Sequence, residues 1–233
     1  MEIQVVSLGL TDYRWAWCLQ QTVHARCQER GDNVLLITEH HPVVTLGYRR
    51  QAEHLRLSRV ELKEKGISLV ESARGGGATY HGPGQIVAYP IFSTLFRRHG
   101  VRIFISLLEE VMCHLCTSYN VVAKRRRGFP GVWVEERKLG AVGIAVRRGT
   151  SLHGFALNIN VDLEPFSYII PCGLSDMVTT SIAQEVINPV TMGEVVQRTC
   201  HAFATIFAVP VKEKNHEWCC IERKAFSRAL DHD

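Results

Sequence analysis

A glycine-rich segment constrains this chain more than any other feature. Residues 74–85 read Arg-Gly-Gly-Gly-Ala-Thr-Tyr-His-Gly-Pro-Gly-Gln, and strand-like runs at 67–71 and 86–89 bracket them. A flexible linker would not interleave arginine, tyrosine, histidine and proline with its glycines. Glycine lets the backbone approach a ligand closely, and the larger residues supply polar contacts and walls. The segment therefore predicts a binding loop, with a purely structural cluster of turns as the alternative.

Two common phosphate-binding motifs do not fit this segment. A P-loop would end in Gly-Lys followed by Ser or Thr, and no such ending is present. In the dinucleotide-binding pattern, Tyr80 would occupy the position of the third glycine. The loop is therefore expected to serve another kind of ligand.

The composition suits a chain that buries a core. Of its 233 residues, 46% are hydrophobic, enough for one large or two small domains. The longest apolar runs, such as 202–209, fall short of the roughly 20 residues that a membrane-spanning helix needs. No charged-then-apolar leader or transit segment precedes the strand-like run 1–6. We therefore expect a cytoplasmic protein that does not act at a membrane.

The eight cysteines show no spacing typical of a disulfide framework, so reduced thiols are expected. Cys113 and Cys116 form a CxxC pair, but they fall inside a helix predicted near residues 105–119. A redox pair would gain acidity at a helix N-terminus instead. A zinc site would need a second ligand pair, and Cys219 with Cys220 lacks the usual spacing. The sequence predicts no metal site.

Positive residues gather in three short runs although the formal net charge is only +4. The runs lie at 97–99, 124–127 and 147–148. Such runs are typical of solvated loops, and they also suit an acidic partner. Binding to nucleic acid is a competing explanation.

Periodicity and capping signals divide the chain into helices and strands. Apolar residues recur every four positions from Trp15 to Cys27, which predicts a helix over 12–28 that Gly31 closes. Capping boxes predict two more helices, one ending before residue 66 and one reaching residue 208. Their residues are Ser58 with Glu61 and Thr191 with Glu194. Further strands are expected at 33–38, 43–46 and 155–162, with a hairpin of 131–135 and 139–146.

The chain shows no internal repeat and no long linker. We therefore expect one main α+β domain over residues 1–209. A C-terminal appendage, expected to be helical, would cover residues 210–233.

The run from Lys138 to Val146 has an unusual pattern. As a strand it would carry Val142, Ile144 and Val146 on one face and only alanine and glycine on the other. The bare face would cover either a packed helix or an elongated apolar ligand such as an acyl chain. Simple alternation places Lys138 on the branched face. An irregularity near Gly140, or a position at the strand mouth, is needed to bring Lys138 to a site on the bare face.

Cys172 stands between Pro171 and Gly173. The proline fixes its own φ, and the glycine admits backbone angles that other residues avoid, so the thiol is presented on a constrained turn. This arrangement indicates a reactive nucleophile. The alternative is a buried cysteine that packs as a small hydrophobic residue.

Four motifs occur in the order found in lipoyl(octanoyl) transferases, which the chain resembles over about residues 33–187. They read RGGGATYHGPGQIVAYP, RKLGAVGIAVRRG, LHGFALNINVDLEPF and IIPCGL. The glycine-rich motif would also suit the related lipoate ligases, whereas Pro-Cys-Gly is the transferase family's own mark. The resemblance implies an α+β (α/β) fold with a mixed, largely antiparallel central sheet flanked by helices, as in biotin and lipoate ligases.

This resemblance also implies a reaction without ATP, metal or other cofactor. An octanoyl group would pass from acyl carrier protein to a lysine on lipoyl domains of 2-oxoacid dehydrogenases or on the glycine cleavage H protein. This transfer is the first step of endogenous lipoate biosynthesis. Cys172 would carry the acyl group as a thioester. Lys138 would lower the pKa of the thiol and relay protons, because the incoming lysine must lose its own proton.

The matched motifs place further residues around the substrate. His81 and His153 are expected to shape the pocket rather than to titrate. Asn158, Asn160 and Asp162 would form either a polar site wall or an ordinary solvated strand face. The residues implied to bind substrate are Arg74, Gly75, Gly76, Gly77, Ala78, Thr79, Tyr80, His81, Ala141, Val142, Gly143, His153, Gly154, Phe155 and Ala156.

Two other functions compete with this interpretation. An ATP-dependent lipoate or biotin ligase of the same superfamily would use Lys138 to bind an adenylate and would not need Cys172. A non-enzymatic nucleic-acid-binding module could use the basic runs, but these lack interleaved aromatic residues and any RNA-binding signature. Binding to nucleic acid is therefore not expected.

Overall fold

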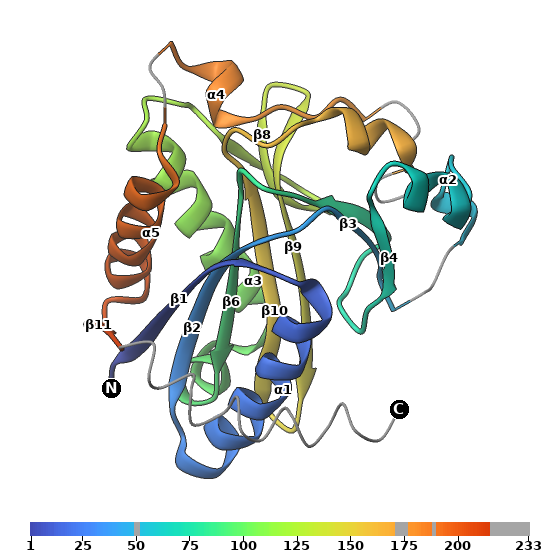
Figure 1. Cartoon of the computed structure of the whole chain (residues 1–233). Helices are drawn as coiled ribbons and strands as arrows, with labels where there is room; N and C mark the ends of the chain where they lie inside the picture. Colours follow the sequence, from blue (N-terminus) through green and yellow to red (C-terminus); the bar gives the residue numbers. More distant parts are fainter. Residues whose placement is uncertain (49–51, 171–176, 188–189, 215–233) are drawn as a thin grey trace, which may run out of the picture.

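The computed structural model describes residues 1–48, 52–170, 177–187 and 190–214. Its described strands form two sheets (Figure 1). The main sheet has eight strands in the order β11-β1-β2-β6-β10-β9-β8-β7. In that order they are Val211–Glu213, Ile3–Thr11, Asn33–His40, Gln85–Phe92, Thr150–Asn158, Arg137–Arg147, Phe129–Val134 and Lys124–Arg126.

Only the β11, β1 and β2 end of this sheet is parallel, and every other neighbouring pair is antiparallel. The smaller sheet has the order β4-β3-β5. Its strands are Ser68–Glu71, Val43–Leu46 and Ala78–His81. The mixed, largely antiparallel α+β architecture expected from the sequence is confirmed.

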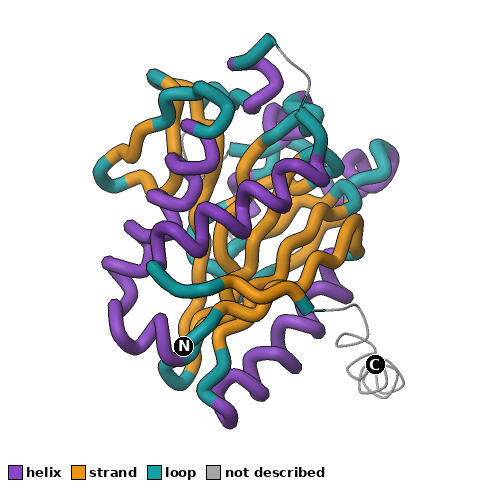
Figure 2. The backbone as a smooth tube through the Cα atoms, turned by 90° about the vertical axis from the view of Figure 1, so that its left-hand side faces the viewer, coloured by secondary structure: helices purple, strands orange, loops and turns teal. Residues whose placement is uncertain are grey.

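Helices cover both faces of the main sheet (Figures 1 and 2). On one side lies α1 (Tyr13–Arg30), and on the other lie α3 (Thr94–Thr117) and α5 (Met192–Phe207). Alternation along β2 explains the layers, since successive side chains of a strand point to opposite faces. Leu35 and Ile37 join the core of α3 and α5, whereas Val34 and Leu36 join the core of α1.

Shorter helices connect the sheets and the edges of the fold. The segment between β3 and β4 holds α2 (Arg59–Glu64), and a short α4 (Ile182–Glu185) precedes α5. Two turns of 3₁₀ helix cover Ala52–His54 and Glu164–Tyr168. None of the described helices is long and apolar enough to cross a membrane.

The sequence predicted capping interactions for three helices, and two of the three are formed. Asp12 caps α1 at the Trp15 amide, and Gly31 closes it in the left-handed conformation with φ of 73°. The capping box before α2 is formed. Thr191 precedes α5 as predicted but makes no side-chain cap bond. The capping-box prediction is wrong there, because the Glu194 carboxylate binds Arg198 one turn further on.

Several strands differ from their predicted ranges. The predicted strand 155–162 begins at Thr150 and ends at Asn158, because the amides of Ile159 and Asn160 both donate to the Gly84 carbonyl and the chain turns away. The glycine-rich segment, expected as a loop throughout, contains β5. The helix predicted near 105–119 begins at Thr94 and is kinked at Gly100. The hairpin of β8 and β9 is confirmed.

The C-terminal prediction is only partly covered by the described residues. Val211–Glu213 forms β11 beside β1, where the Lys214 amide also donates to the Val5 carbonyl. Residues 215–233 lie outside the described residues, so a helical appendage there stays a prediction.

Candidate active site

A cavity lies between β9, β10, β5 and β6 and is closed on one side by the glycine-rich loop. It contains about 770 Å³ of empty space, including the part that opens to solvent. Fourteen of the predicted site residues line it: Arg74, Gly75, Gly76, Ala78, Thr79, His81, Lys138, Ala141, Val142, Gly143, His153, Gly154, Phe155 and Ala156. The fold thus brings together residues that lie up to 82 positions apart in the sequence.

Three predicted residues are placed differently. Tyr80 is buried in the core of the smaller sheet, where its ring meets Phe166 edge-on at 5.6 Å. The Gly77 carbonyl accepts from the Gly47 amide at 3.2 Å, and neither Gly77 nor Tyr80 lines the cavity. The predicted role of Tyr80 at the substrate is therefore not supported by its position. Cys172 lies outside the described residues.

The bare face of β9 is covered by the glycine-rich loop rather than by a helix. The Gly75 amide donates to the Ile144 carbonyl at 3.1 Å, and a Cβ added to Gly143 would stand 2.9 Å from the Gly75 carbonyl oxygen. Further along, Ala141 lines the cavity. The packed helix, α3, lies against the other face, where a Cβ on Gly140 would meet Met112. Of the two alternatives for the bare face, the structure thus supports room for a ligand.

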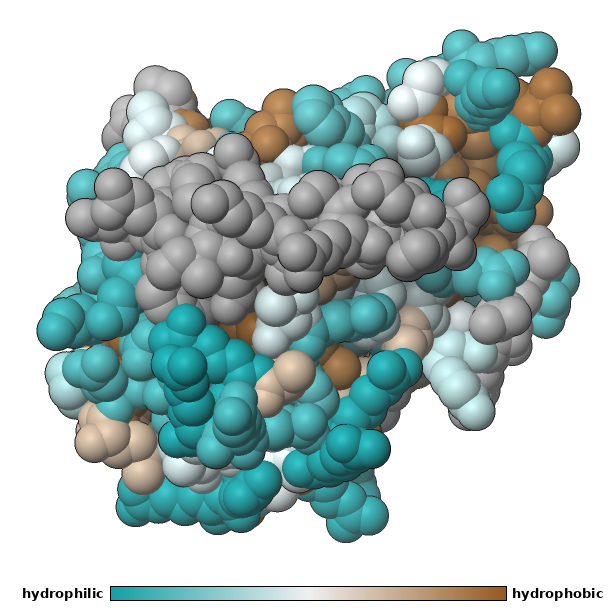
Figure 3. All heavy atoms as spheres, turned by 60° about the horizontal axis from the view of Figure 1, so that its bottom comes forward, coloured by the Kyte–Doolittle hydropathy of each residue, from teal (hydrophilic) through white to brown (hydrophobic). Residues whose placement is uncertain are grey.

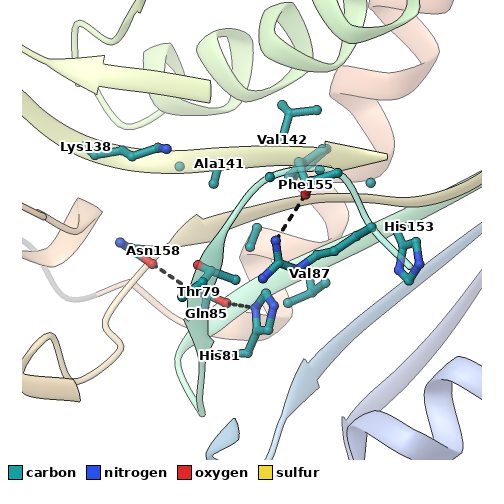
Figure 4. A pocket seen from close by; sticks show the side chains of 18 of the residues that line it. Thr79, His81, Gln85, Val87, Lys138, Ala141, Val142, His153, Phe155 and Asn158 are labelled. Carbon is teal, nitrogen blue, oxygen red and sulfur yellow. Dashed lines mark hydrogen bonds between the residues drawn. The ribbon is translucent and has the colours of Figure 1, made fainter. Parts of the chain in front are cut away.

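An irregularity in β9 brings Lys138 to this cavity. The register against β8 shifts between Val132, which pairs with Gly140, and Trp133, which pairs with Lys138. Leu139 is therefore the extra residue of a β-bulge, and it is fully buried in the core on the α3 side. The bulge reverses the alternation, so Lys138 lies on the same side as Ala141 (Figure 4). Of the two arrangements expected for Lys138, the irregularity near Gly140 is confirmed.

Two hydrogen bonds hold the backbone of Lys138, one at its amide and one at its carbonyl. Its amide donates to the Val178 carbonyl at 2.8 Å, and its carbonyl accepts from the Thr180 amide at 2.9 Å. The Nζ atom lies 5.4 Å from the centre of the Trp133 ring, and the residue is only 6% exposed. The backbone position of Lys138 is therefore fixed, and its side chain is buried at the cavity wall.

Arg74 forms part of the opposite wall. Its guanidinium donates to the Thr45 carbonyl at 2.6 Å and to the Thr45 hydroxyl at 2.8 and 3.0 Å, and its Nη1 donates to the Gly75 carbonyl at 3.1 Å. These bonds fix the loop on Thr45 of β3, the middle strand of the smaller sheet. They also place a buried positive group beside the cavity.

A chain of hydrogen bonds crosses the cavity floor (Figure 4). His81 Nδ1 bonds Gln85 Oε1 at 2.6 Å, Gln85 Nε2 donates to Asn158 Oδ1 at 2.8 Å, and Asn158 Nδ2 donates to the Thr180 carbonyl at 2.9 Å. Because Thr180 also binds the backbone of Lys138, the chain connects the glycine-rich segment to the lysine. Asn158 is a buried wall residue, whereas Asn160 and Asp162 are exposed and lie beyond the strand.

The buried histidines are neutral near pH 7. Burial lowers the pKa of His40 to about 4 and that of His153 to about 3. Burial, followed by the charges of His40 and Arg74, places the pKa of His81 well below its ordinary value. These directions favour histidines that shape the pocket.

Aromatic and apolar residues complete the cavity. Tyr13 stacks on His81 with ring centres 5.9 Å apart and bonds the Ser72 hydroxyl, and burial raises its pKa. No aspartate or glutamate belongs to the described lining. Six further lining residues were not predicted from the sequence: Tyr13, Val87, Tyr89, Phe166, Met177 and Thr179. Val87, Tyr89 and Phe166 lie within the quoted motifs, which could have pointed to them, whereas Tyr13, Met177 and Thr179 lie outside any motif.

Cys113 and Cys116 lie in α3 as predicted. Burial raises the pKa of both thiols, which keeps them protonated. In the described part of the chain, no group of three or more His, Cys, Asp or Glu residues could hold a metal ion.

The basic runs are exposed but are not all loops. Lys124–Arg126 is the edge strand β7, where Arg125 pairs with Glu110 at 2.9 Å and Arg126 with Glu136 at 2.6 Å. The other two runs lie near each other, since Arg97 Nε donates to the carbonyl of Gly149, the residue after the run 147–148, at 3.4 Å. The face of the molecule drawn in Figure 3 is mainly hydrophilic where its residues are coloured.

Comparison with known proteins identifies the family of this chain. The model of the lipoyl protein ligase A/B catalytic domain matches residues 12–204. An octanoyltransferase of Desulfotalea psychrophila is 44% identical over 207 residues, which cover 87% of this chain and 93% of the relative. An octanoyltransferase of Desulfovibrio desulfuricans is 44% identical over 183 residues, covering 78% and 77%.

Solved structures share the fold at low sequence identity. A crystal structure of lipoate-protein ligase A bound with ATP has a TM-score of 0.82 at 18% identity and covers 97% of this chain and 95% of that one. A bipartite lipoate protein ligase from Thermoplasma acidophilum, studied with its E2 lipoyl domain, has a TM-score of 0.76 at 18% identity and covers 97% and 91%. These similarities establish the architecture around the cavity.

Proposed function

The chain belongs to the lipoyl protein ligase A/B catalytic domain family, and we propose that it is an octanoyltransferase of lipoate biosynthesis. The observation that carries this function is the 44% identity to curated octanoyltransferases over most of the chain. The cavity agrees with it, because its small and apolar walls suit an acyl chain. Lipoyl-domain proteins are the acceptors, and octanoyl-acyl carrier protein is the proposed donor.

Cys172 is the proposed nucleophile of the first half-reaction. Its thiolate attacks the carbonyl carbon of the donor thioester, the new carbon–sulfur bond forms, and the bond to the donor sulfur breaks. The departing thiolate takes a proton from the Lys138 ammonium group. The product is an octanoyl thioester on Cys172 and a neutral Lys138. Met177, five positions after Cys172, lines the cavity and supports this placement.

The second half-reaction uses the lysine of the acceptor. Its amine starts with a pKa near about 10.4 and must lose a proton to attack. That first proton leaves to solvent. The neutral amine then forms the amide bond with the octanoyl carbonyl carbon, the bond to Cys172 breaks, and the second proton that the nitrogen loses on becoming an amide passes to the neutral Lys138. This step restores the thiolate and the ammonium group, so one lysine serves both half-reactions. The fixed backbone of Lys138 supports this role.

The cavity walls divide between the two ends of the substrate. Ala141, Val87 and Ala156 offer apolar surface to the acyl chain, whereas Arg74 and His81 lie where the glycine-rich loop meets it. The basic runs suit a donor protein with an acidic surface. Their ion pairs with Glu110 and Glu136 leave Arg127 and Lys124 exposed beside them.

A transfer assay without ATP tests the function against the ligase alternative. The full chain is incubated with octanoyl-acyl carrier protein and an isolated lipoyl domain, and octanoylation of the domain is measured by mass. We expect full modification without ATP. Modification that needs ATP and free octanoate, with none from the carrier protein, would establish a ligase instead. Binding of nucleic acid with no acyl transfer would favour the non-enzymatic alternative.

A further inference from the structure

His153 stands at the end of the cavity away from Lys138 and has no hydrogen-bond partner for its ring among the described residues. It lines the cavity, is 1% exposed, and leaves both Nδ1 and Nε2 unbonded. Buried polar side chains almost always have a partner, because an unpaired donor or acceptor loses its hydration without compensation. The unpaired ring nitrogens of His153 therefore point to a hydrogen-bonding group of a ligand that binds in the cavity.

The backbone of His153 is built into an unusual conformation. Its φ is +57°, inside strand β10, and its amide donates to the Gln20 side chain of α1 at 3.0 Å. Next to it, a Cβ on Gly154 would stand 2.0 Å from the Ala88 carbonyl oxygen, so the strand is pressed against β6 here. Non-glycine residues with positive φ are uncommon and concentrate at functional sites. The strand thus fixes the backbone that carries this ring.

The surroundings of the ring are aromatic. Trp17 stacks on His153 with ring centres 4.6 Å apart and an interplanar angle of 7°, and Tyr89 approaches at 6.4 Å. Arg74 and Arg147 are the charged groups that act on it, and with burial they keep the imidazole neutral. A neutral imidazole offers one N–H donor and one nitrogen acceptor. A hydroxyl group or a water molecule can bond either nitrogen, as an acceptor from the N–H or as a donor to the bare nitrogen.

The length of the cavity relates this ring to the acyl chain. His153 of β10 pairs with Ile144 of β9. Ile144 lies six positions after Lys138, or five when the extra residue of the bulge is not counted. At about 3.3 Å per residue these levels lie roughly 16 Å apart. The Lys138 side chain runs toward Ala141 in Figure 4 and fills the first part. Roughly 10 Å remain, about the extended length of eight carbons with bonds of about 1.5 Å.

We propose that His153 is a specificity-determining residue that binds a hydrogen-bonding group at the far end of the acyl chain. The cavity then accepts eight-carbon chains with a terminal hydroxyl as well as octanoyl, whose methyl end leaves a water molecule on His153. The inference rests on the proposed function, since it assumes that the acyl carbonyl lies at the Lys138 end. A cavity with an apolar end would instead reject the hydroxyl, because it would be buried without a partner.

Titration calorimetry with two free acids tests this end of the cavity. Octanoate and 8-hydroxyoctanoate are titrated into the full chain at neutral pH. We expect dissociation constants within about threefold of each other. A preference of tenfold or more for octanoate, about 1.4 kcal/mol, would overturn the inference. Failure of both acids to bind would overturn it as well.

Two variants assign the effect to the ring. His153→Phe keeps an aromatic ring on Trp17 but removes both nitrogens, and we expect it to bind 8-hydroxyoctanoate at least tenfold more weakly than octanoate. His153→Asn tolerates a positive φ and keeps a donor and an acceptor, so its ratio should stay closer to that of the unmodified chain. Equal ratios in the Phe variant and the unmodified chain would contradict the proposal. If the Phe variant does not fold, the ratio in the unmodified chain decides.

The proposed function can fail separately. Acylation of the full chain by octanoyl-acyl carrier protein is measured in parallel. Equal binding of the two acids without acylation would overturn the transferase mechanism and leave the role of His153 standing. Acylation together with a tenfold preference for octanoate would overturn the role of His153 and leave the transferase mechanism standing.

Discussion

Lys138 and Val178 are joined by a backbone hydrogen bond of 2.8 Å, which connects the start of strand β9 to the segment that follows residue 176. The bulge at Leu139 and this bond together decide where the lysine side chain lies. Neither depends on the charge of the side chain. Replacing the side chain should therefore leave the cavity in place and remove only the proton carrier.

Lys138→Ala should slow both acylation and transfer by about 10²–10⁴-fold, the usual contribution of a positioned acid or base. Binding of the carrier protein should change little, because the backbone bonds of residue 138 remain. Single-turnover rates with octanoyl-acyl carrier protein measure the first step, and addition of a lipoyl domain measures the second. Lys63→Ala, an exposed lysine of α2, is the matched control. A pH–rate profile with the same thiol pKa in both variants would refute the role of Lys138.

Asn158→Ala should lower both stability and turnover. It removes the donor to the Thr180 carbonyl and the acceptor for Gln85, at a cost of about 1–3 kcal/mol for buried groups left unpaired. Because Thr180 binds the Lys138 backbone, kcat should fall more than KM rises. Urea denaturation and steady-state kinetics measure the two effects. The exposed Asn160→Ala is the control, and equal losses in both variants would dismiss the hydrogen-bond chain.

Gly143→Ala should displace the glycine-rich loop. Its new Cβ would stand 2.9 Å from the Gly75 carbonyl oxygen, a backbone atom that can yield only if the loop moves. We expect acylation to fall at least tenfold, with the loop shift visible in a crystal structure of the variant. Gly193→Ala in α5 meets nothing within 4 Å and should change stability by less than about 1 kcal/mol. Full activity of the Gly143 variant would show that the loop does not need this close approach.

Acid should destabilise the fold through its buried histidines. The pKa of His40 is lowered to about 4 in the folded chain, whereas an unfolded histidine has a pKa of about 6.5. The unfolded state therefore binds more protons below pH 6.5. Stability is fully present above that pH and is lost as the pH falls toward 4, by up to about 1.4 kcal/mol per pH unit for each such group.

Urea denaturation at several pH values between 7.5 and 4.5 measures this loss. His40→Asn should flatten the slope of unfolding free energy against pH, whereas the exposed His41→Gln should not. His40 is bonded to Tyr89 at 2.6 Å, so the Asn variant is compared through its slope and not through its absolute stability. An unchanged slope in the Asn variant would show that His40 is not the group that titrates.

Short-range patterns predicted the parts of the fold that depend on local chemistry. The α1 helix with its two caps, the hairpin of β8 and β9, and the bare face of β9 all follow from residue spacing. An irregularity near Gly140 was one of two arrangements that the pattern allowed for bringing Lys138 to the site, beside a position at the strand mouth, and the structure has the irregularity. The resemblance to a known family added the substrate.

Long-range contacts account for what the sequence did not predict. Strand β5 pairs with β3, although β5 comes from a segment whose glycines argue against a strand. Tyr13 reaches the cavity only because α1 packs over β6 and β10. The positive φ of His153 accompanies a bond from its amide to the Gln20 side chain, 133 positions away, and nothing in the local sequence indicates this contact.

The central claim is that Cys172 carries the octanoyl group. Intact mass measurement of the full chain after incubation with octanoyl-acyl carrier protein, followed by peptide mapping, tests it most directly. We predict one octanoyl adduct on the peptide that contains Cys172, its disappearance on addition of a lipoyl domain, and no adduct on Cys172→Ala. An unchanged mass of the unmodified chain, or the same adduct on the alanine variant, would contradict it.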